Sequence, residues 1–124
     1  MRAVKTLIYL ASPMYVFTDD RYDDMIVRAS AYGIVIPARG MFNSNKQWLE
    51  TFKAKLDRLD RLIFFTCDEG WIGRGVLAEI NYMLDEEKPV HRMFNSGKLV
   101  AWGACDVAQR NPNNWKKTMR FEGD

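Results

Sequence analysis

Short apolar runs alternate with longer amphipathic segments along most of this chain, and this alternation restricts the possible folds more than any other feature of the sequence. We expect strands at four apolar runs and at one further candidate run: residues 6–11, 34–36, 62–65, 90–94 and 98–102. We expect three helices: one that is capped at Thr18-Asp19-Asp20 and stops at Gly33, one at about 45–59, and one at 75–86. Strands and helices that alternate at this spacing predict an α/β fold, a mainly parallel sheet with helices on both faces.

Size and charge narrow the functional classes. The chain has 124 residues, of which 48% are hydrophobic, and this predicts a single domain with a real core. Its 18 basic and 16 acidic residues are scattered, so a nucleic acid polymer is not an expected partner. No uninterrupted apolar run approaches the roughly 20 residues needed to cross a bilayer, so a membrane is not expected either. Cys67 and Cys105 lie far apart and no leader pattern precedes the first strand, which favours the cytoplasm. Residues 103–124 are expected to form a polar C-terminal tail, with Trp115 as its one large anchor.

The loops after the first three strands are the expected ligand-binding elements, because ligands of open parallel sheets bind at the carboxyl ends of the strands. These loops begin at Ser12-Pro13, at residue 37 and at Thr66. If the strand order is 2-1-3-4-5, the loops at Ser12 and Thr66 face each other across one crevice. Tyr9, near the end of the first strand, would then point either toward that crevice or into the core.

Residues 62–90 combine a strand, a glycine-containing loop and a helix that carries Glu79. Gly73 and Gly75 permit close backbone approach, and the free amides at the start of the following helix favour an anion. A merely tight connection between the strand and the helix would explain the same glycines. Glu79 lies at the edge of the apolar stripe of its helix, where a carboxylate is usually solvated.

Six short segments, in consistent order over about residues 5–92, resemble the nucleoside 2-deoxyribosyltransferase superfamily, and most closely its small phage and bacterial members. The segments are Ile8-Tyr9-Leu10-Ala11-Ser12-Pro13, Asp60-Arg61-Leu62-Ile63-Phe64-Phe65, Gly70-Trp71, Gly73-Arg74-Gly75, Ala78-Glu79-Ile80 and Lys88-Pro89-Val90. The resemblance implies a flavodoxin-like (Rossmann-like) three-layer sandwich with a mainly parallel sheet of four to five strands. It also implies a homo-oligomer that needs no cofactor or metal and cleaves the N-glycosidic bond of a nucleoside or nucleotide.

The resemblance also assigns roles to particular residues. Glu79 matches the catalytic glutamate of the superfamily and Tyr9 the tyrosine that lines the pocket. A carboxylate can attack an anomeric carbon, a nearby helix N-terminus would keep it ionised, and Asp68 or Glu69 is a candidate acid for the departing base. The expected substrate contacts are Tyr9, Ser12, Pro13, Thr66, Trp71, Gly73, Arg74 and Gly75.

Two of these contacts have alternatives. Arg74 could bind a 5′-phosphate or be a solvated loop residue, and Trp71 could close the loop against the core, although we favour its stacking on a base.

Two features depart from the superfamily pattern. Its transferases carry a further aspartate upstream of the glutamate that supports the sugar, whereas residues 48–52 contain no clear match, and Asp57 and Asp60 are the alternatives. Three residues separate Gly75 from Glu79, which is a longer spacing than the usual one. Three functions therefore remain open: an N-glycosidase or deoxyribosyltransferase, a nucleotide-binding sensor or sponge without chemistry, and a flavodoxin-like interaction module.

Overall fold

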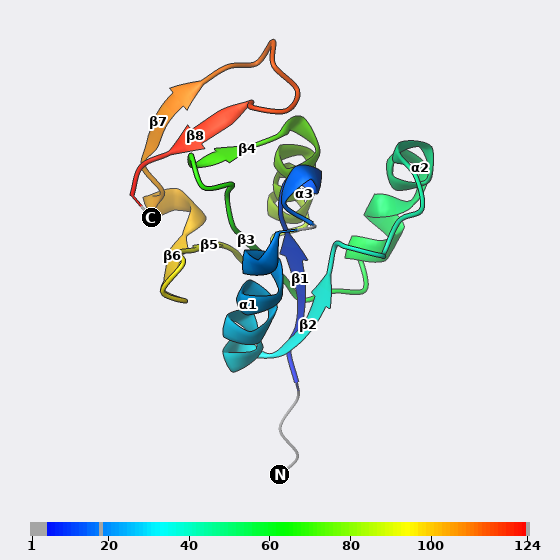
Figure 1. Ribbon diagram of the computed structural model, residues 1–124. Coiled ribbons are helices and arrows are strands. Elements are labelled where there is room, and N and C mark those ends of the chain that lie inside the picture. The colour runs from blue at the N-terminus through cyan, green and yellow to red at the C-terminus, as the bar shows by residue number, and fades with distance from the viewer. Residues whose placement is uncertain (1–4, 18, 124) are drawn as a thin grey trace.

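The main sheet contains five strands in the order β2-β1-β3-β5-β6. The computed structural model describes residues 5–17 and 19–123, and Figure 1 shows the arrangement of the elements. Strands β1, β2, β3 and β5 are parallel, and β6 runs antiparallel to β5. The strands are β1 (Leu7–Ala11), β2 (Ile34–Pro37), β3 (Arg61–Phe64), β5 (Val90–Met93) and β6 (Leu99–Ala101). The predicted α/β class with a mainly parallel sheet is confirmed, and the arrangement is compatible with a Rossmann-like layered fold. In the observed order β1 lies beside β3, which is the condition under which the loops at Ser12 and Thr66 would face each other.

The three predicted helices are present with adjusted ends: α1 (Asp20–Ala29), α2 (Asn45–Leu56) and α3 (Arg74–Asp85). Asp19 caps α1 by accepting a hydrogen bond from the Arg21 backbone N–H at 2.9 Å, whereas Thr18, predicted to share this cap, lies outside the described residues. A 3₁₀ turn (Ser30–Tyr32) continues α1, and the chain then turns at Gly33, as predicted. A Cβ at Gly33 would lie 2.5 Å from the Thr6 carbonyl oxygen, so only glycine fits this close approach.

The side chains of β1 alternate between two apolar clusters on opposite faces of the sheet. Ile8 and Leu10 pack into a cluster that includes residues of α1, whereas Tyr9 and Ala11 pack into a cluster that includes residues of α2 and α3. All four of these side chains are 1% exposed or less. Strand β1 is therefore buried on both faces, as its apolar sequence predicts.

The C-terminal residues form a second, three-stranded antiparallel sheet in the order β4-β8-β7. Its strands are β4 (Trp71–Ile72), β7 (Val107–Arg110) and β8 (Met119–Phe121). The arrows of β1 and β2 point upward in Figure 1, and this small sheet lies at the top of the view. Within the described ranges, no helix is both long and apolar enough to cross a bilayer.

The expectation of a polar tail anchored by Trp115 is wrong. Met119 and Phe121 are 5% and 2% exposed, whereas Trp115 is 59% exposed. The reason is the alternation of side chains along β8, which pairs on both edges and turns two apolar residues inward. Strand β8 therefore contributes Met119 and Phe121 to the core.

Candidate functional site

Glu79 lies inside the protein. It follows the first turn of α3 on the face that buries Val76, Ile80 and Met83, and it is 4% exposed. From the sequence we expect this carboxylate at the edge of the apolar stripe, whereas in the structure its side chain is buried in the core. A buried carboxylate needs hydrogen-bond donors, because burial without them costs several kcal/mol, on the order of 2–7 for a polar group.

Two side chains supply those donors. The Tyr9 hydroxyl from β1 donates to Glu79 Oε2, and the Trp48 indole Nε1 from the first turn of α2 donates to the same oxygen at 3.0 Å. No described residue donates to the other oxygen, Oε1. Tyr9 thus lies in the core and meets Glu79, so the structure brings together the two residues to which the resemblance gives the main roles. Sequence analysis missed Trp48 as a partner because its spacing in the α2 stripe indicates only a core residue.

Burial dominates the electrostatics of this cluster. Desolvation raises the pKa of Glu79 from 4.5 to about 7, and the hydrogen bonds from Tyr9 and Trp48 lower it only in part. Burial and the neighbouring Glu79 also raise the pKa of the Tyr9 phenol well above its usual value, which keeps it a neutral donor. Burial therefore opposes the ionisation that we expected the α3 N-terminus to favour, and both forms of Glu79 are accessible near neutral pH. A carboxyl with a pKa near neutrality is suited to change its protonation state during a reaction.

The start of α3 is in contact with the C-terminal segment. The Arg74 backbone N–H donates to the Trp115 carbonyl at 2.8 Å, and the Arg74 guanidinium reaches the Pro112 carbonyl at 3.4 Å. A Cβ at Gly73 would lie 2.9 Å from the same Trp115 oxygen, whereas a Cβ at Gly75 would lie 3.8 Å from the Trp48 ring. Gly73 therefore makes room for the chain's own backbone at the place where the sequence suggests a phosphate.

The loop after β3 has a buried and an exposed part. Thr66 is 7% exposed, and its hydroxyl donates to the Cys67 carbonyl at 2.9 Å. Trp71 is 9% exposed, belongs to β4 and packs in the apolar cluster with Phe65. This packing is the alternative considered for Trp71, closure of the loop against the core, and the stacking of Trp71 on a base stays a prediction.

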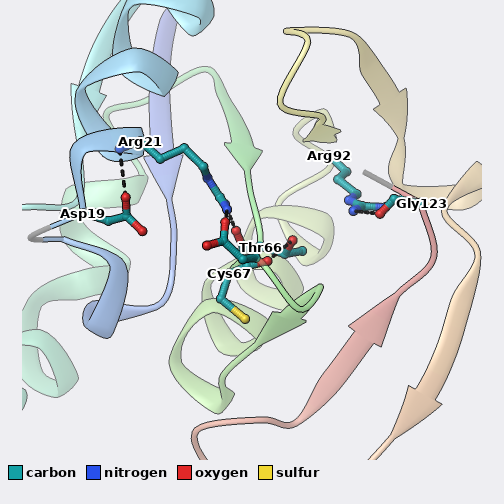
Figure 2. A network of polar contacts seen from close by, with 7 residues as sticks. Asp19, Arg21, Thr66, Cys67, Arg92 and Gly123 are labelled. Atoms are coloured by element: carbon teal, nitrogen blue, oxygen red, sulfur yellow. Dashed lines mark hydrogen bonds and ion pairs between the residues drawn. The ribbon is translucent and has the colours of Figure 1, made fainter.

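Asp68 lies on the exposed side of this loop, 77% exposed, and forms an ion pair with Arg21 of α1. The Arg21 guanidinium also donates to the Thr66 carbonyl and lies 5.3 Å from the centre of the Phe65 ring. Figure 2 shows Arg21 reaching from α1 to Thr66 and Cys67. No hydrogen bond or ion pair joins Asp68 to Tyr9 or Glu79 in the described part of the chain. The sequence does not indicate that Arg21 contacts this loop, because its partners Asp68 and Thr66 are 47 and 45 residues away in the chain.

Ser12 follows the carboxyl end of β1, beside the end of β3, where the Phe65 N–H donates to the Ala11 carbonyl at 3.2 Å. It is 4% exposed, and its hydroxyl has no hydrogen-bond partner among the described residues. Pro13, the next residue, precedes a short 3₁₀ turn (Met14–Val16). Ser12 is thus a buried polar group without a partner at the end of the sheet where the ligand is expected.

The two alternatives for the upstream aspartate lie elsewhere. Asp60 Oδ2 accepts a hydrogen bond from the Leu7 N–H at 2.7 Å, at the amino end of β1. Asp57 accepts one from the Tyr82 hydroxyl near the end of α3. Among residues 48–52, the side chain that reaches Glu79 is Trp48. An indole donor to the glutamate therefore comes from the stretch in which the resemblance leads us to expect a carboxylate.

A polar cavity of about 570 Å³ opens beside the loop after β3 but does not include Tyr9, Trp48 or Glu79. Figure 2 shows two of its arginines, with Arg21 directed at the loop and Arg92 at Gly123. The lining residues that carry charge are Arg21, Asp68, Glu69, Arg92, Arg120 and Glu122. Within residues 5–17 and 19–123, no group of three or more His, Cys, Asp or Glu side chains could hold a metal ion.

The fold and this cluster define an α/β protein with a buried, hydrogen-bonded glutamate at the junction of β1, α2 and α3. No family model, curated protein or solved structure matches the chain. The function is therefore inferred from the chemistry of Glu79 and its two hydrogen-bond donors, Tyr9 and Trp48.

Proposed function

We propose that this protein cleaves the N-glycosidic bond of a nucleoside or nucleotide, or transfers the 2-deoxyribosyl group to a second base, with Glu79 as the nucleophile. The observation that supports this proposal is the hydrogen bonding of Glu79 Oε2 by Tyr9 and Trp48, whereas none of the residues that the structure describes donates to Oε1. We further propose that the layered fold is a flavodoxin-like three-layer sandwich and that the protein is a cytoplasmic homo-oligomer.

The proposed reaction uses the ionised form of Glu79. Oε1 forms a bond to the anomeric carbon while the bond from that carbon to the base nitrogen breaks, and the base leaves with the electron pair and takes up a proton. Water or a second base then attacks the same carbon and releases Glu79. Asp68 stays a candidate donor of the proton that the base takes up, although its carboxylate is exposed and paired with Arg21. Because the pKa of Glu79 is about 7, the ionised form that the reaction needs is accessible at neutral pH.

A second candidate function is nucleotide binding without turnover. Glu79 is only 4% exposed, and the Trp115 carbonyl accepts from the first amide of α3, where an anion would otherwise bind. These contacts disfavour attack by Glu79 on a bound sugar, and a protein that binds a nucleotide without attacking it would act as a sensor or sponge. The two functions differ in whether the glycosidic bond of a bound ligand survives.

The deciding experiment incubates the pure protein with a panel of nucleosides and 5′-monophosphates and measures free base by chromatography. We expect base release by the wild type, its loss in Glu79→Gln, and its retention in Glu50→Gln, a matched control at an exposed position on α2. Base release that is unchanged in Glu79→Gln would refute the catalytic proposal. Recovery of an intact nucleotide from the denatured wild type, without any free base, would support the binding function instead.

A further inference from the structure

Trp48 occupies an unusual position for a residue of an apolar helical stripe. It lies in the first turn of α2, is half-buried, and directs its indole N–H across the interface between α2 and α3 to a carboxylate. An indole N–H is only a donor, so its partner must accept a hydrogen bond at every pH at which the protein is folded. Glu79 Oε2 therefore acts as a hydrogen-bond acceptor in this contact.

Packing orients the indole independently of Glu79. The Trp48 ring stacks on Phe52, one turn later in α2, with ring centres 4.6 Å apart and planes 9° from parallel. On the side of α3, Gly75 has no side chain, and a Cβ there would lie 3.8 Å from the indole. The donor is therefore held by Phe52 and faces a helix surface that leaves room for it.

The two donors on Oε2 determine where the proton of neutral Glu79 resides. Because Tyr9 and Trp48 both donate to Oε2, a proton bound to the carboxyl is directed to Oε1. Protonation thus blocks Oε1, to which no residue in the described ranges donates. Ionisation exposes the lone pairs of Oε1 while both donors stabilise the charge on the carboxylate.

We propose that Trp48 is a positioning residue for Glu79: its indole N–H holds Oε2 so that Oε1 is the oxygen that attacks the sugar carbon. This inference rests on the proposed catalytic function, and it adds a residue that the resemblance does not supply. Trp48 acts through Glu79 and need not touch the substrate. By donating to Oε2, Trp48 leaves Oε1 available for the reaction and stabilises the ionised carboxylate.

The groups around Glu79 allow a clear pH test. The titratable side chains that interact with it are the phenols of Tyr9 on β1 and Tyr22 on α1, and the pKa of each is raised, mainly by burial. From α2 the interacting group is Trp48, which does not titrate. A fall in kcat/KM as the pH decreases through neutrality, the acid limb of the pH profile, is therefore caused by protonation of Glu79. Since the Trp48 hydrogen bond lowers the pKa of Glu79, removal of that bond moves the limb to higher pH.

The test compares Trp48→Phe, which retains an aromatic ring to stack on Phe52 but lacks the donor, with Leu49→Ala, a control at a 69% exposed position on the same helix. The first measurement is the titration of the Glu79 carboxyl by carbon-13 NMR, which requires no turnover. The second is the pH profile of kcat/KM for base release. We expect a higher titration midpoint and about a tenfold loss of kcat/KM below the midpoint in Trp48→Phe, with only partial recovery at alkaline pH because Oε2 still lacks its second donor, and no change in Leu49→Ala.

The possible outcomes separate this inference from the proposed function. An unchanged Glu79 titration in folded Trp48→Phe would overturn the inference, and so would a shifted titration without a matching shift in the kcat/KM profile. If the titration shifts and the wild type releases no base at any pH, the catalytic proposal fails, and the assignment of Trp48 to positioning an attacking oxygen fails with it. In that case the hydrogen bond between Trp48 and Glu79 is still established.

Discussion

Burial of Glu79 predicts that the protein loses stability as the pH rises through neutrality. The pKa of the folded carboxyl is about 7, and 4.5 is the value expected for a solvated glutamate in the unfolded chain. Between these values the folded protein binds more protons than the unfolded chain, so the free energy of unfolding falls with increasing pH. The contribution of this one group is fully present below pH 4.5 and is lost above pH 7. Its total size is on the order of 3 kcal/mol.

Urea unfolding of the wild type and of Glu79→Gln between pH 4.5 and 8.5 measures this contribution. The amide of glutamine does not titrate, and its oxygen can accept the same hydrogen bonds from Tyr9 and Trp48. Taking the difference between the two proteins removes the effects of all other titrating groups. We expect Glu79→Gln to gain stability relative to the wild type by about 3 kcal/mol across this range, with most of the gain between pH 5 and 7.

Glu50→Gln serves as the matched control, because Glu50 is exposed on α2 and its replacement should leave the pH dependence of the wild type unchanged. A difference between Glu79→Gln and the wild type that stays constant from pH 4.5 to 8.5 would refute the burial of an ionisable Glu79. A difference of opposite sign, with the wild type gaining stability at high pH, would mean that the hydrogen bonds outweigh desolvation.

Three further predictions concern the packing around the site. Gly73→Ala should lower the free energy of unfolding by about 1–3 kcal/mol, because the added Cβ meets the Trp115 carbonyl oxygen. Gly75→Ala, where the helix has room, should be neutral or stabilising by up to about 1 kcal/mol. Equal melting temperatures for the two variants would contradict the contact at Gly73. Phe121→Ala should cost about 3–5 kcal/mol in urea unfolding and Trp115→Ala less than about 0.5, and the reverse order would restore the anchor predicted from the sequence. Asp19→Ala should cost about 1 kcal/mol through loss of the α1 cap, and thermal unfolding without any decrease would argue against that cap.

The alternation of strands and helices, and with it the mainly parallel sheet, could be predicted from the sequence because its determinants are local. Each strand is a short apolar run, and helices of suitable length separate the runs, which leaves few ways to connect them. The second sheet could not be predicted in this way. Strand β4 has two residues and lies in a glycine-containing loop, and its partner β8 is almost 50 residues away, with Trp71 opposite Arg120. No local pattern indicates such a pairing.

The site residues also divide into those that the sequence indicates and those that only tertiary packing brings together. Tyr9 and Glu79 could both be named as site residues in advance through the resemblance, although the sequence leaves open whether Tyr9 points toward the crevice or into the core. Trp48 could not, because its distance to Glu79 depends on how α2 packs on α3, and helical spacing indicates only that its side chain faces the core. The shift in the pKa of Glu79 has the same origin, because it results from tertiary burial.

The departure at residues 48–52 can now be described in chemical terms. An aspartate from this stretch would accept hydrogen bonds from a sugar hydroxyl, whereas Trp48 donates one to Glu79. The remaining carboxylate of the stretch, Glu50, is exposed on α2. If the proposed reaction occurs, stabilisation that the aspartate would give the sugar is replaced in this protein by stabilisation of the nucleophile. Substrate preference would then depend less on the hydroxyl groups of the sugar than on the ionisation of Glu79, and the pH at which the protein acts should follow the pKa of that one carboxyl.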